Sequence, residues 1–421
     1  MVNNLKKNNL KKKLELEESR PSQTFQRTIL PNGMTIVFER RDIPVVSVAF
    51  AVRNGGINED LSEKGISHFI EHLLYKGTPA RDARKIAEEI EKNGGDLNGF
   101  TDELITAYWC KMPARHLDVA LDVLSDMVKN PLFAEEEIEK ERKVIFEEIK
   151  MRKDNPLIYT LDNIPGCLYE APLGVPLIGT VKTMNSLDRK KIVEKFEEIY
   201  SPNNLILCVV GKADFNQIVS FVKKNFGDKK GKVPQIKIKT KYLSKTEKRA
   251  GIDQASLVFS YHIPLAGEKN AAAAKVLTTL MAGGMSSRLF HEIREKRNLA
   301  YSIKGDSESN KDFAYSFIYV GTTKENLSEV KKIILEEFDR VVKHLTLEEL
   351  NSIKDQLVGN YQISMEDSQS QMVNLLMHEI DGNAKTFYDF EKKILGVTLE
   401  EVKSIAANAL KMHSFFELIP E

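Results

Sequence analysis

An internal repeat is the feature that most restricts how this chain can fold. Apolar segments at 45–52 and 255–262 are both predicted as buried strands, and segments at 116–129 and 326–344 are both predicted as amphipathic helices. The two helices begin 210 residues apart (326 − 116 = 210). The sequence therefore predicts an α+β fold of two homologous domains, each a mostly antiparallel sheet covered by helices on one side.

The length of the chain and its composition suggest where the domains begin and end. A chain of 421 residues is too long for a single core, and two domains of about 200 residues are expected. We expect a charged N-terminal tail at 1–20, a first domain at 21–228, a Lys-rich linker at 229–248 and a second domain at 249–421.

The overall charge and the cysteines exclude several classes of protein. The chain carries 61 basic and 61 acidic residues, so no global basic field would attract nucleic acid or an anionic membrane. The widely spaced cysteines, Cys110, Cys167 and Cys208, form neither a disulfide framework nor a cysteine-type zinc site. No apolar run approaches the ~20 residues that span a bilayer, and the start shows no signal-peptide pattern. We therefore expect a cytoplasmic protein that binds neither nucleic acid nor membrane.

One predicted helix, at 65–77, carries the pattern His-x-x-Glu-His. His68 and His72 are four residues apart, so both imidazoles lie on one face of the helix and can bind one Zn²⁺ at about 2.0–2.1 Å. Glu71 points to nearly the same side, where a carboxylate can take a proton from zinc-bound water. An ordinary structural role for these residues is disfavoured, because burying them unpaired would cost several kcal/mol. The corresponding helix of the second half, at 271–284, has neither His nor Glu, so we expect one zinc ion per chain.

A catalytic zinc site needs three protein ligands and an open position, so one ligand is still missing. The predicted helix at 135–150 is rich in acidic residues and is the best source of this ligand. Glu141 and Glu148 are seven residues apart and share a face of the helix, which the adjacent Glu147 does not. The residues alone leave open which of these carboxylates binds the metal.

Several longer segments accompany the histidine helix. Glu148 follows His72 by 76 residues (148 − 72 = 76), and the chain also contains LPNGMTIVFE, GGDLNGFTDELITAYW, SPNNLILCVVGKAD and GGMSSRLFHEIREKRNLAYSI. Together these motifs resemble the pitrilysin/insulinase-type zinc metallopeptidases, whose inverted histidine motif defines the inverzincins. The resemblance covers residues 24–415 and is closest to bacterial and archaeal relatives of the mitochondrial processing peptidase.

The resemblance implies a zinc-dependent endopeptidase that hydrolyses unfolded or extended peptides inside a closed chamber. It implies that His68, His72 and Glu148 are the zinc ligands and that Glu71 is the general base. It also implies that Glu141 supports the site without binding the metal directly.

The resemblance further implies how a peptide is held. Asn98, Gly99 and Phe100 match the sheet edge on which substrates of the family lie as an added strand. Gly99 stands where relatives more often have Ala. Arg294 and Tyr301 in the second half match a pair that hydrogen-bonds the substrate carbonyl near the cut. Larger family members carry four such domains in one chain, so we expect this chain to form a homodimer with active sites completed by both subunits.

Two other functions remain open at this point. The chain could be a non-catalytic partner subunit of a heterodimeric processing peptidase, although such subunits characteristically lack the metal-binding helix that is present here. It could also be a metallohydrolase that acts on another class of substrate. The zinc content per chain would distinguish the first alternative, and competition by a casein-like peptide would test the second.

Overall fold

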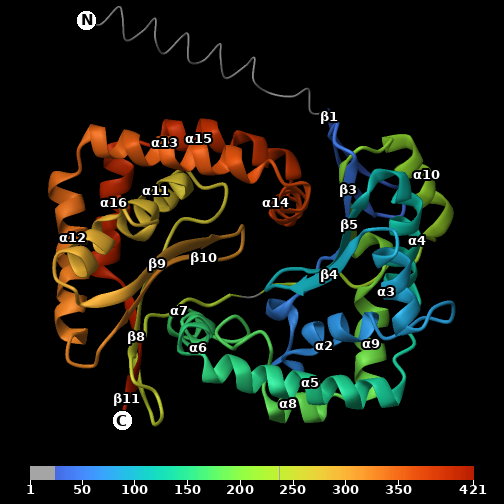
Figure 1. The fold of residues 1–421 in the computed structure, drawn as a ribbon, viewed down its shortest axis with the longest axis horizontal. Coiled ribbons are helices and arrows are strands. Elements are labelled where there is room, and N and C mark those ends of the chain that lie inside the picture. The colour runs from blue at the N-terminus through green and yellow to red at the C-terminus, as the bar shows by residue number, and fades with distance from the viewer. Residues whose placement is uncertain (1–23, 237) are drawn as a thin grey trace, which may run out of the picture.

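Two β-sheets, one from each half of the chain, organise the fold (Figure 1). The structure is a computed structural model that describes residues 24–236 and 238–421. The predicted charged tail at 1–20 lies outside the described residues. Within the described part, no helix is both long enough and apolar enough to cross a bilayer.

The secondary structure alternates between strands and helices in both halves. The first half comprises β1 (Thr24–Ile29), β2 (Thr35–Arg40), β3 (Val45–Val52), α2 (Ile66–Leu74), α3 (Ala83–Glu91), β4 (Asp96–Thr101), β5 (Thr106–Pro113), α4 (Leu117–Lys129), α5 (Glu135–Asp154), α6 (Pro156–Asn163), α7 (Pro165–Leu168), α8 (Val181–Ser186), α9 (Arg189–Ile199), β6 (Leu205–Gly211) and α10 (Phe215–Asn225). The second half comprises β7 (Lys245–Arg249), β8 (Ala255–His262), α11 (Ala271–Ala282), the π-helical segment η5 (Phe290–Glu295), β9 (Ala300–Ser309), β10 (Ala314–Thr322), α12 (Leu327–His344), α13 (Leu347–Ser364), α14 (Ser368–Ile380), α15 (Phe390–Gly396), α16 (Leu399–Lys411) and β11 (Ser414–Pro420).

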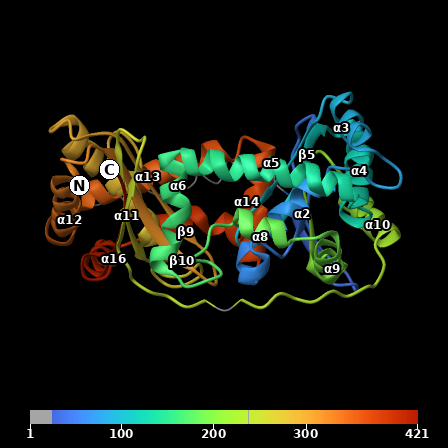
Figure 2. The same ribbon diagram turned by 90° about the horizontal axis from the view of Figure 1, so that it is seen from below.

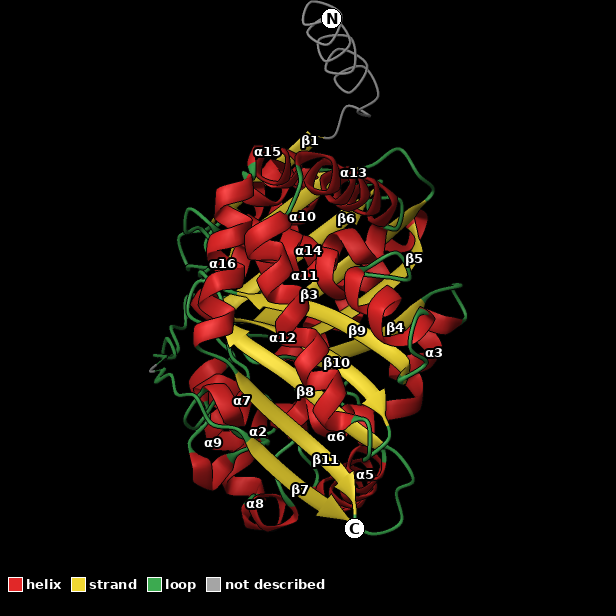
Figure 3. Ribbon diagram, turned by 90° about the vertical axis from the view of Figure 1, so that its left-hand side faces the viewer, coloured by secondary structure: helices red, strands yellow, loops and turns green. Residues whose placement is uncertain are grey.

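Apart from the additional edge strand β1, the strands of the first sheet have counterparts in the same order in the second, which confirms the predicted duplication. The first sheet has the order β1-β2-β6-β3-β5-β4. The second has the order β7-β11-β8-β10-β9, which can be followed in Figure 3. In each sheet one pair is parallel, β2 with β6 and β7 with β11, and the other pairs are antiparallel. Corresponding strands such as β3 and β8 begin 210 residues apart (255 − 45 = 210).

Strand β7 shortens the predicted linker. Residues 245–248 were expected to belong to it, but they pair with β11, and Lys245 lies opposite Phe416. The sequence KTEKR shows no apolar alternation because β7 is an edge strand whose residues are exposed or half-buried. The described residues of the segment before it run along the outside of the molecule between the two halves (Figure 2).

The expectation that helices cover one side of each sheet is wrong, because both faces are covered. Strand β6 is buried along its whole length. Alternate residues of a strand face opposite sides, so β6 supplies two separate cores. Leu205, Leu207 and Val209 face the core of the first half, whereas Ile206, Cys208 and Val210 enter a core shared with the second half.

The shared core is closed by helices that the two halves exchange. Helix α14 of the second half packs on β3 and β6 of the first sheet, and helix α6 of the first half packs on β8 and β11 of the second. In Figure 1 the green α6 accordingly lies on the side of the second half. The two helices occupy corresponding places in the repeat (368 − 156 = 212). Each half therefore completes the core of the other.

A buried carboxylate ties α14 to the first sheet. Glu379 is fully buried and accepts two hydrogen bonds from Arg27 on β1, at 2.7 and 2.8 Å. Arg53, next to the end of β3, donates to the same carboxylate at 3.0 Å, and the backbone N–H of Ala384 donates at 3.1 Å. Because both carboxylate oxygens are paired, this contact holds the two halves in a defined orientation.

We expect Glu379→Gln to lower the free energy of unfolding by about 3 kcal/mol, because two arginines lose their buried counter-charge. The value is at the low end for a broken buried pair, since Arg27 and Arg53 keep about a quarter of their side-chain surface exposed. Chemical denaturation would measure it. Asp339→Asn is the matched control, because its pair with Lys343 is exposed and its loss should change stability by less than about 1 kcal/mol. Equal effects of the two variants would contradict the assigned role of Glu379.

Candidate metal centre and active site

A buried carboxylate fixes the first turn of α2, the helix that carries the His-x-x-Glu-His pattern. Glu59 accepts hydrogen bonds from the backbone N–H groups of Gly65 (2.9 Å) and Ser67 (2.7 Å), which the helix itself leaves unpaired. Gly65 has a φ of +98°, and a Cβ there would lie 2.6 Å from the carbonyl oxygen of Ile178, so only glycine fits. The apolar face of α2 is buried in the core of the first half through Ile66, Phe69, Ile70, Leu73 and Leu74.

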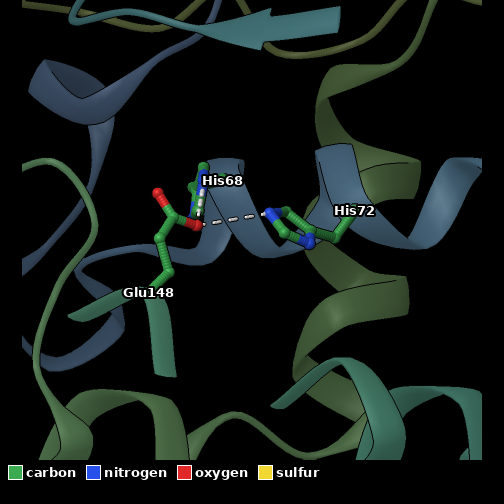
Figure 4. A group of neighbouring side chains, drawn as sticks. All are labelled: His68, His72 and Glu148. Carbon is green, nitrogen blue, oxygen red and sulfur yellow. Dashed lines mark ion pairs between the residues drawn. The ribbon is translucent and has the colours of Figure 1, made fainter. Parts of the chain in front are cut away.

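Helices α2 and α5 bring two imidazoles and one carboxylate together (Figure 4). The Oε2 atom of Glu148 lies 3.5 Å from Nε2 of His68 and 3.7 Å from Nε2 of His72. Ligand atoms about 2.1 Å from a tetrahedral zinc would be ~3.4 Å apart, so this group fits the ion. Glu147, the neighbouring residue, is exposed and lines a different depression on the outside of α5.

The electrostatic surroundings keep one imidazole in its metal-binding form. Burial, together with the nearby His72 and Arg152, lowers the pKa of His68 to about 3. The ring is therefore neutral at physiological pH, as a metal ligand must be.

Glu71 lies beside the candidate ligands His68, His72 and Glu148 but is not one of them. Its Oε2 atom accepts a hydrogen bond of 2.7 Å from the hydroxyl of Thr101 on β4. Burial raises the pKa of Glu71, which favours a carboxylate that can hold a proton transiently. Glu71, His68 and Glu148 line the same depression of about 250 Å³. The arrangement can therefore bind a metal ion and move a proton next to it.

Glu141 contacts His72 at the ring nitrogen that does not face Glu148. The carboxylate is buried, and its Oε2 atom lies 3.1 Å from Nδ1 of His72. Its other oxygen, Oε1, forms an ion pair with Nζ of Lys76 at 2.7 Å. A carboxylate on the far ring nitrogen of a metal-binding histidine fixes the ring orientation and the tautomer.

Arg152 and Asp162 also line the depression, although neither was predicted from the sequence. Arg152 pairs with Asp162 at 2.7 and 3.0 Å, and its Nη1 atom lies 3.9 Å from Oε1 of Glu148. The spacing of Glu148 and Arg152 on α5 is visible in the sequence, but Asp162 comes from α6 and is placed by tertiary packing. Thr101 and Lys76 were missed for the same reason.

The segment expected to hold substrate forms the edge strand β4, next to α2. Gly99 and Phe100 line the depression beside His68, whereas the exposed Asn98 turns its side-chain oxygen back to the N–H of Gly99 (2.8 Å). No other strand among the described residues pairs with the outer edge of β4.

Arg294 and Tyr301 lie in the second half, on η5 and β9. The guanidinium of Arg294 lies over the ring of Phe290 at 4.8 Å, and Tyr301 is 55% exposed beside Gly321. Within the described part of the chain, no hydrogen bond or ion pair joins either side chain to α2 or α5, and neither lines the depression. The structure of one chain therefore does not bring this pair to the candidate metal centre.

Comparisons with known proteins identify the family of this chain and agree with its fold. The family model described as insulinase (peptidase family M16) matches residues 35–181, and the model described as the peptidase M16 inactive domain matches residues 186–357. An uncharacterized zinc protease of Bacillus subtilis is 31% identical over 388 residues, covering 91% of this chain and 95% of the relative. Another from Streptomyces coelicolor is 32% identical over 404 residues, with 92% and 87% covered.

Solved structures show the same fold. A protease from Helicobacter pylori has a TM-score of 0.87 at 22% identity, covering 94% of this chain and all of the other. A structure from Pseudomonas fluorescens, described as a peptidase M16 inactive domain, has a TM-score of 0.84 at 19% identity, covering 94% of this chain and 98% of the other. The sequence relatives and the family models together show that the chain belongs to the insulinase family, peptidase family M16.

Proposed function

We propose that this protein is a zinc-dependent endopeptidase that cleaves unfolded or extended peptides within a chamber. The observation that carries the proposal is the convergence of His68, His72 and Glu148, with Oε2 of Glu148 at 3.5 and 3.7 Å from the two Nε2 atoms. One zinc ion per chain would bind there. Glu71 on the same wall of the depression supplies the acid–base group that peptide hydrolysis needs.

The protein side of the mechanism follows from the contacts of these residues. Zinc bound there supplies Lewis acidity and lowers the pKa of a water molecule. Glu71 takes the proton from the attacking water and then gives it to the leaving amine, while the hydroxyl of Thr101 holds Oε2 of Glu71. Glu141 keeps the ring of His72 oriented through Nδ1.

The free edge of β4 supports the proposed mode of substrate binding. An extended peptide can add to this edge as a further strand, with main-chain hydrogen bonds that depend little on its side chains. Asn98, Gly99 and Phe100 would then face the peptide. Binding of this kind suits unfolded substrates.

We further propose that the protein acts as a homodimer. Arg294 and Tyr301 are exposed or half-exposed and are not engaged with the metal centre of their own chain. A two-fold arrangement could place Arg294 and Tyr301 of the partner subunit near the zinc, as donors for the substrate carbonyl.

A non-catalytic partner subunit is the second candidate function. The match of residues 186–357 to an M16 inactive domain and the similar Pseudomonas fluorescens structure favour it. That match begins in the first half and ends in α13, and it includes α11, the counterpart of the histidine helix, which has no histidine. The intact set of candidate ligands in the first half supports the catalytic proposal instead.

Glu148→Gln should weaken zinc binding more than about 100-fold, beyond the 10–100-fold typical of a residue that only supports a ligand. Glu141→Gln should fall within that range, and Glu147→Gln, which changes an exposed neighbour, should bind zinc as the wild type does. Chelator competition with metal analysis of each purified variant would measure the order. A larger loss for Glu147→Gln than for Glu148→Gln would refute the proposed ligand set.

Glu71→Gln should keep one zinc ion per chain and lose peptide cleavage by at least ~100-fold, because an amide cannot accept the proton of the attacking water. Metal analysis and fragment detection by mass spectrometry on a mixed peptide library would test both properties. Cleavage at a near-normal rate would exclude Glu71 as the base. A wild-type chain that binds no zinc and cleaves no peptide would favour the partner-subunit function.

Mixing Glu71→Gln and Tyr301→Phe should restore activity if the sites are shared between subunits. Each heterodimer would contain one intact composite site and should show about half the activity of a wild-type dimer. The measurement is peptide cleavage by isolated heterodimers after subunit exchange, with each unmixed variant as the control. A wild-type monomer that is fully active, or no recovery despite proven exchange, would contradict the shared site.

A further inference from the structure

The hydroxyl of Tyr75, just after α2, has no evident structural role. The Tyr75 ring packs against the core of the first half, and its centroid lies 6.0 Å from that of Tyr108. Its hydroxyl oxygen is buried and has no hydrogen-bond partner among the described residues. Buried polar atoms almost always have a partner, and a phenylalanine would pack the same ring without this cost. Packing therefore does not explain why residue 75 is tyrosine and not phenylalanine.

The space that this hydroxyl occupies exists only because residue 99 is glycine. A Cβ on Gly99 would lie 2.4 Å from the hydroxyl oxygen of Tyr75, which is closer than real atoms approach. It would also lie 2.8 Å from the carbonyl oxygen of Ala107 on the neighbouring strand β5. A tyrosine hydroxyl at 75 and a side chain at 99 are therefore mutually exclusive in this arrangement.

The same point of space lies next to the proposed base. A Cβ on Gly99 would be 3.3 Å from Oε1 of Glu71, so this oxygen and the Tyr75 hydroxyl border the same small gap. Glu71 and Tyr75 are four residues apart, which places them on one side of the helix. Thr101 already donates to the other carboxylate oxygen, Oε2, at 2.7 Å. Each carboxylate oxygen can accept more than one hydrogen bond, so Oε1 has capacity for a donor.

We propose that Tyr75 is a positioning residue for Glu71 and that its hydroxyl donates a hydrogen bond to Oε1 of Glu71 when the site holds zinc and peptide. Thr101 and Tyr75 then hold the carboxylate from its two oxygens and fix the plane in which it meets the attacking water. Gly99 provides the room for this contact. The inference rests on the proposed peptidase function, in which Glu71 is the base.

Tyr75→Phe isolates the hydroxyl while it keeps the ring. We expect kcat to fall about 10-fold, in the range of outer-shell partners, with KM changed less than about twofold because the hydroxyl does not touch the peptide. Zinc content should stay at the wild-type value and the melting temperature should not fall, since no ligand and no hydrogen bond of the resting protein is lost and an unpaired buried hydroxyl is removed. Tyr242→Phe, which removes an exposed hydroxyl from the segment between the halves, is the matched control and should leave kcat unchanged.

The shared space is tested without any activity measurement. Gly99→Ala should lower the melting temperature, and adding Tyr75→Phe should recover part of that loss, because the 2.4 Å clash with the hydroxyl disappears. The contact of the added methyl with the Ala107 carbonyl remains in both variants, so recovery is partial.

The outcomes separate this inference from the function on which it rests. An unchanged kcat for Tyr75→Phe in an active, zinc-loaded protein would overturn the role of Tyr75 and leave the peptidase proposal intact. No recovery of the melting temperature in the double variant would also overturn it. A wild-type chain that cleaves no peptide when loaded with zinc would overturn both.

Discussion

Burial of the central strands on both faces is the constraint on which this fold depends. Strand β6 is apolar at every position from Leu205 to Val210, so each face must be covered by other apolar groups. The helices of the first half cover one face, and α14 of the second half covers the other. Because α6 does the same for the second sheet, the repeated units are packed as one body. The orientation of the sheets, and of everything attached to them, follows from this exchange.

The candidate metal centre depends on the core beneath it. The apolar side of α2 is anchored in the first half, which leaves His68, Glu71 and His72 on the side that faces α5 and β4. Helix α5 brings Glu148 to the two imidazoles, and β4 brings Thr101 to Glu71. Three elements that are distant in the sequence thus define the positions of five side chains within a small volume. Such preorganisation lets polar groups act without first rearranging.

Much of this arrangement is predictable from the sequence, and the limits have physical reasons. The four-residue spacing of His68 and His72 suffices to place them together, since helix geometry is local. The choice of Glu148 over Glu147 needed the family resemblance, because spacing alone left the third ligand open. Strand β7 was missed since an edge strand of charged residues carries no apolar alternation. The partners of α6 and α14 were missed because periodicity reveals which face of a helix is apolar but not which surface covers it.

The exchange of α6 and α14 is consistent with an origin of this chain by duplication of a single repeat. A single repeat on its own would expose the sheet face that a helix of the other repeat now covers. Its own exchanged helix, α6 or α14, would have no sheet to pack against. Two identical copies would cover both sheet faces and bury both helices by exchanging that helix, as domain-swapped dimers do. The correspondence of α6 and α14 at the same place in each repeat is the pattern that fusion of such a dimer into one chain would leave. Helix α11 of the second repeat has no histidine, yet the second repeat is still needed, because its helix α14 completes the core of the repeat that carries the histidines.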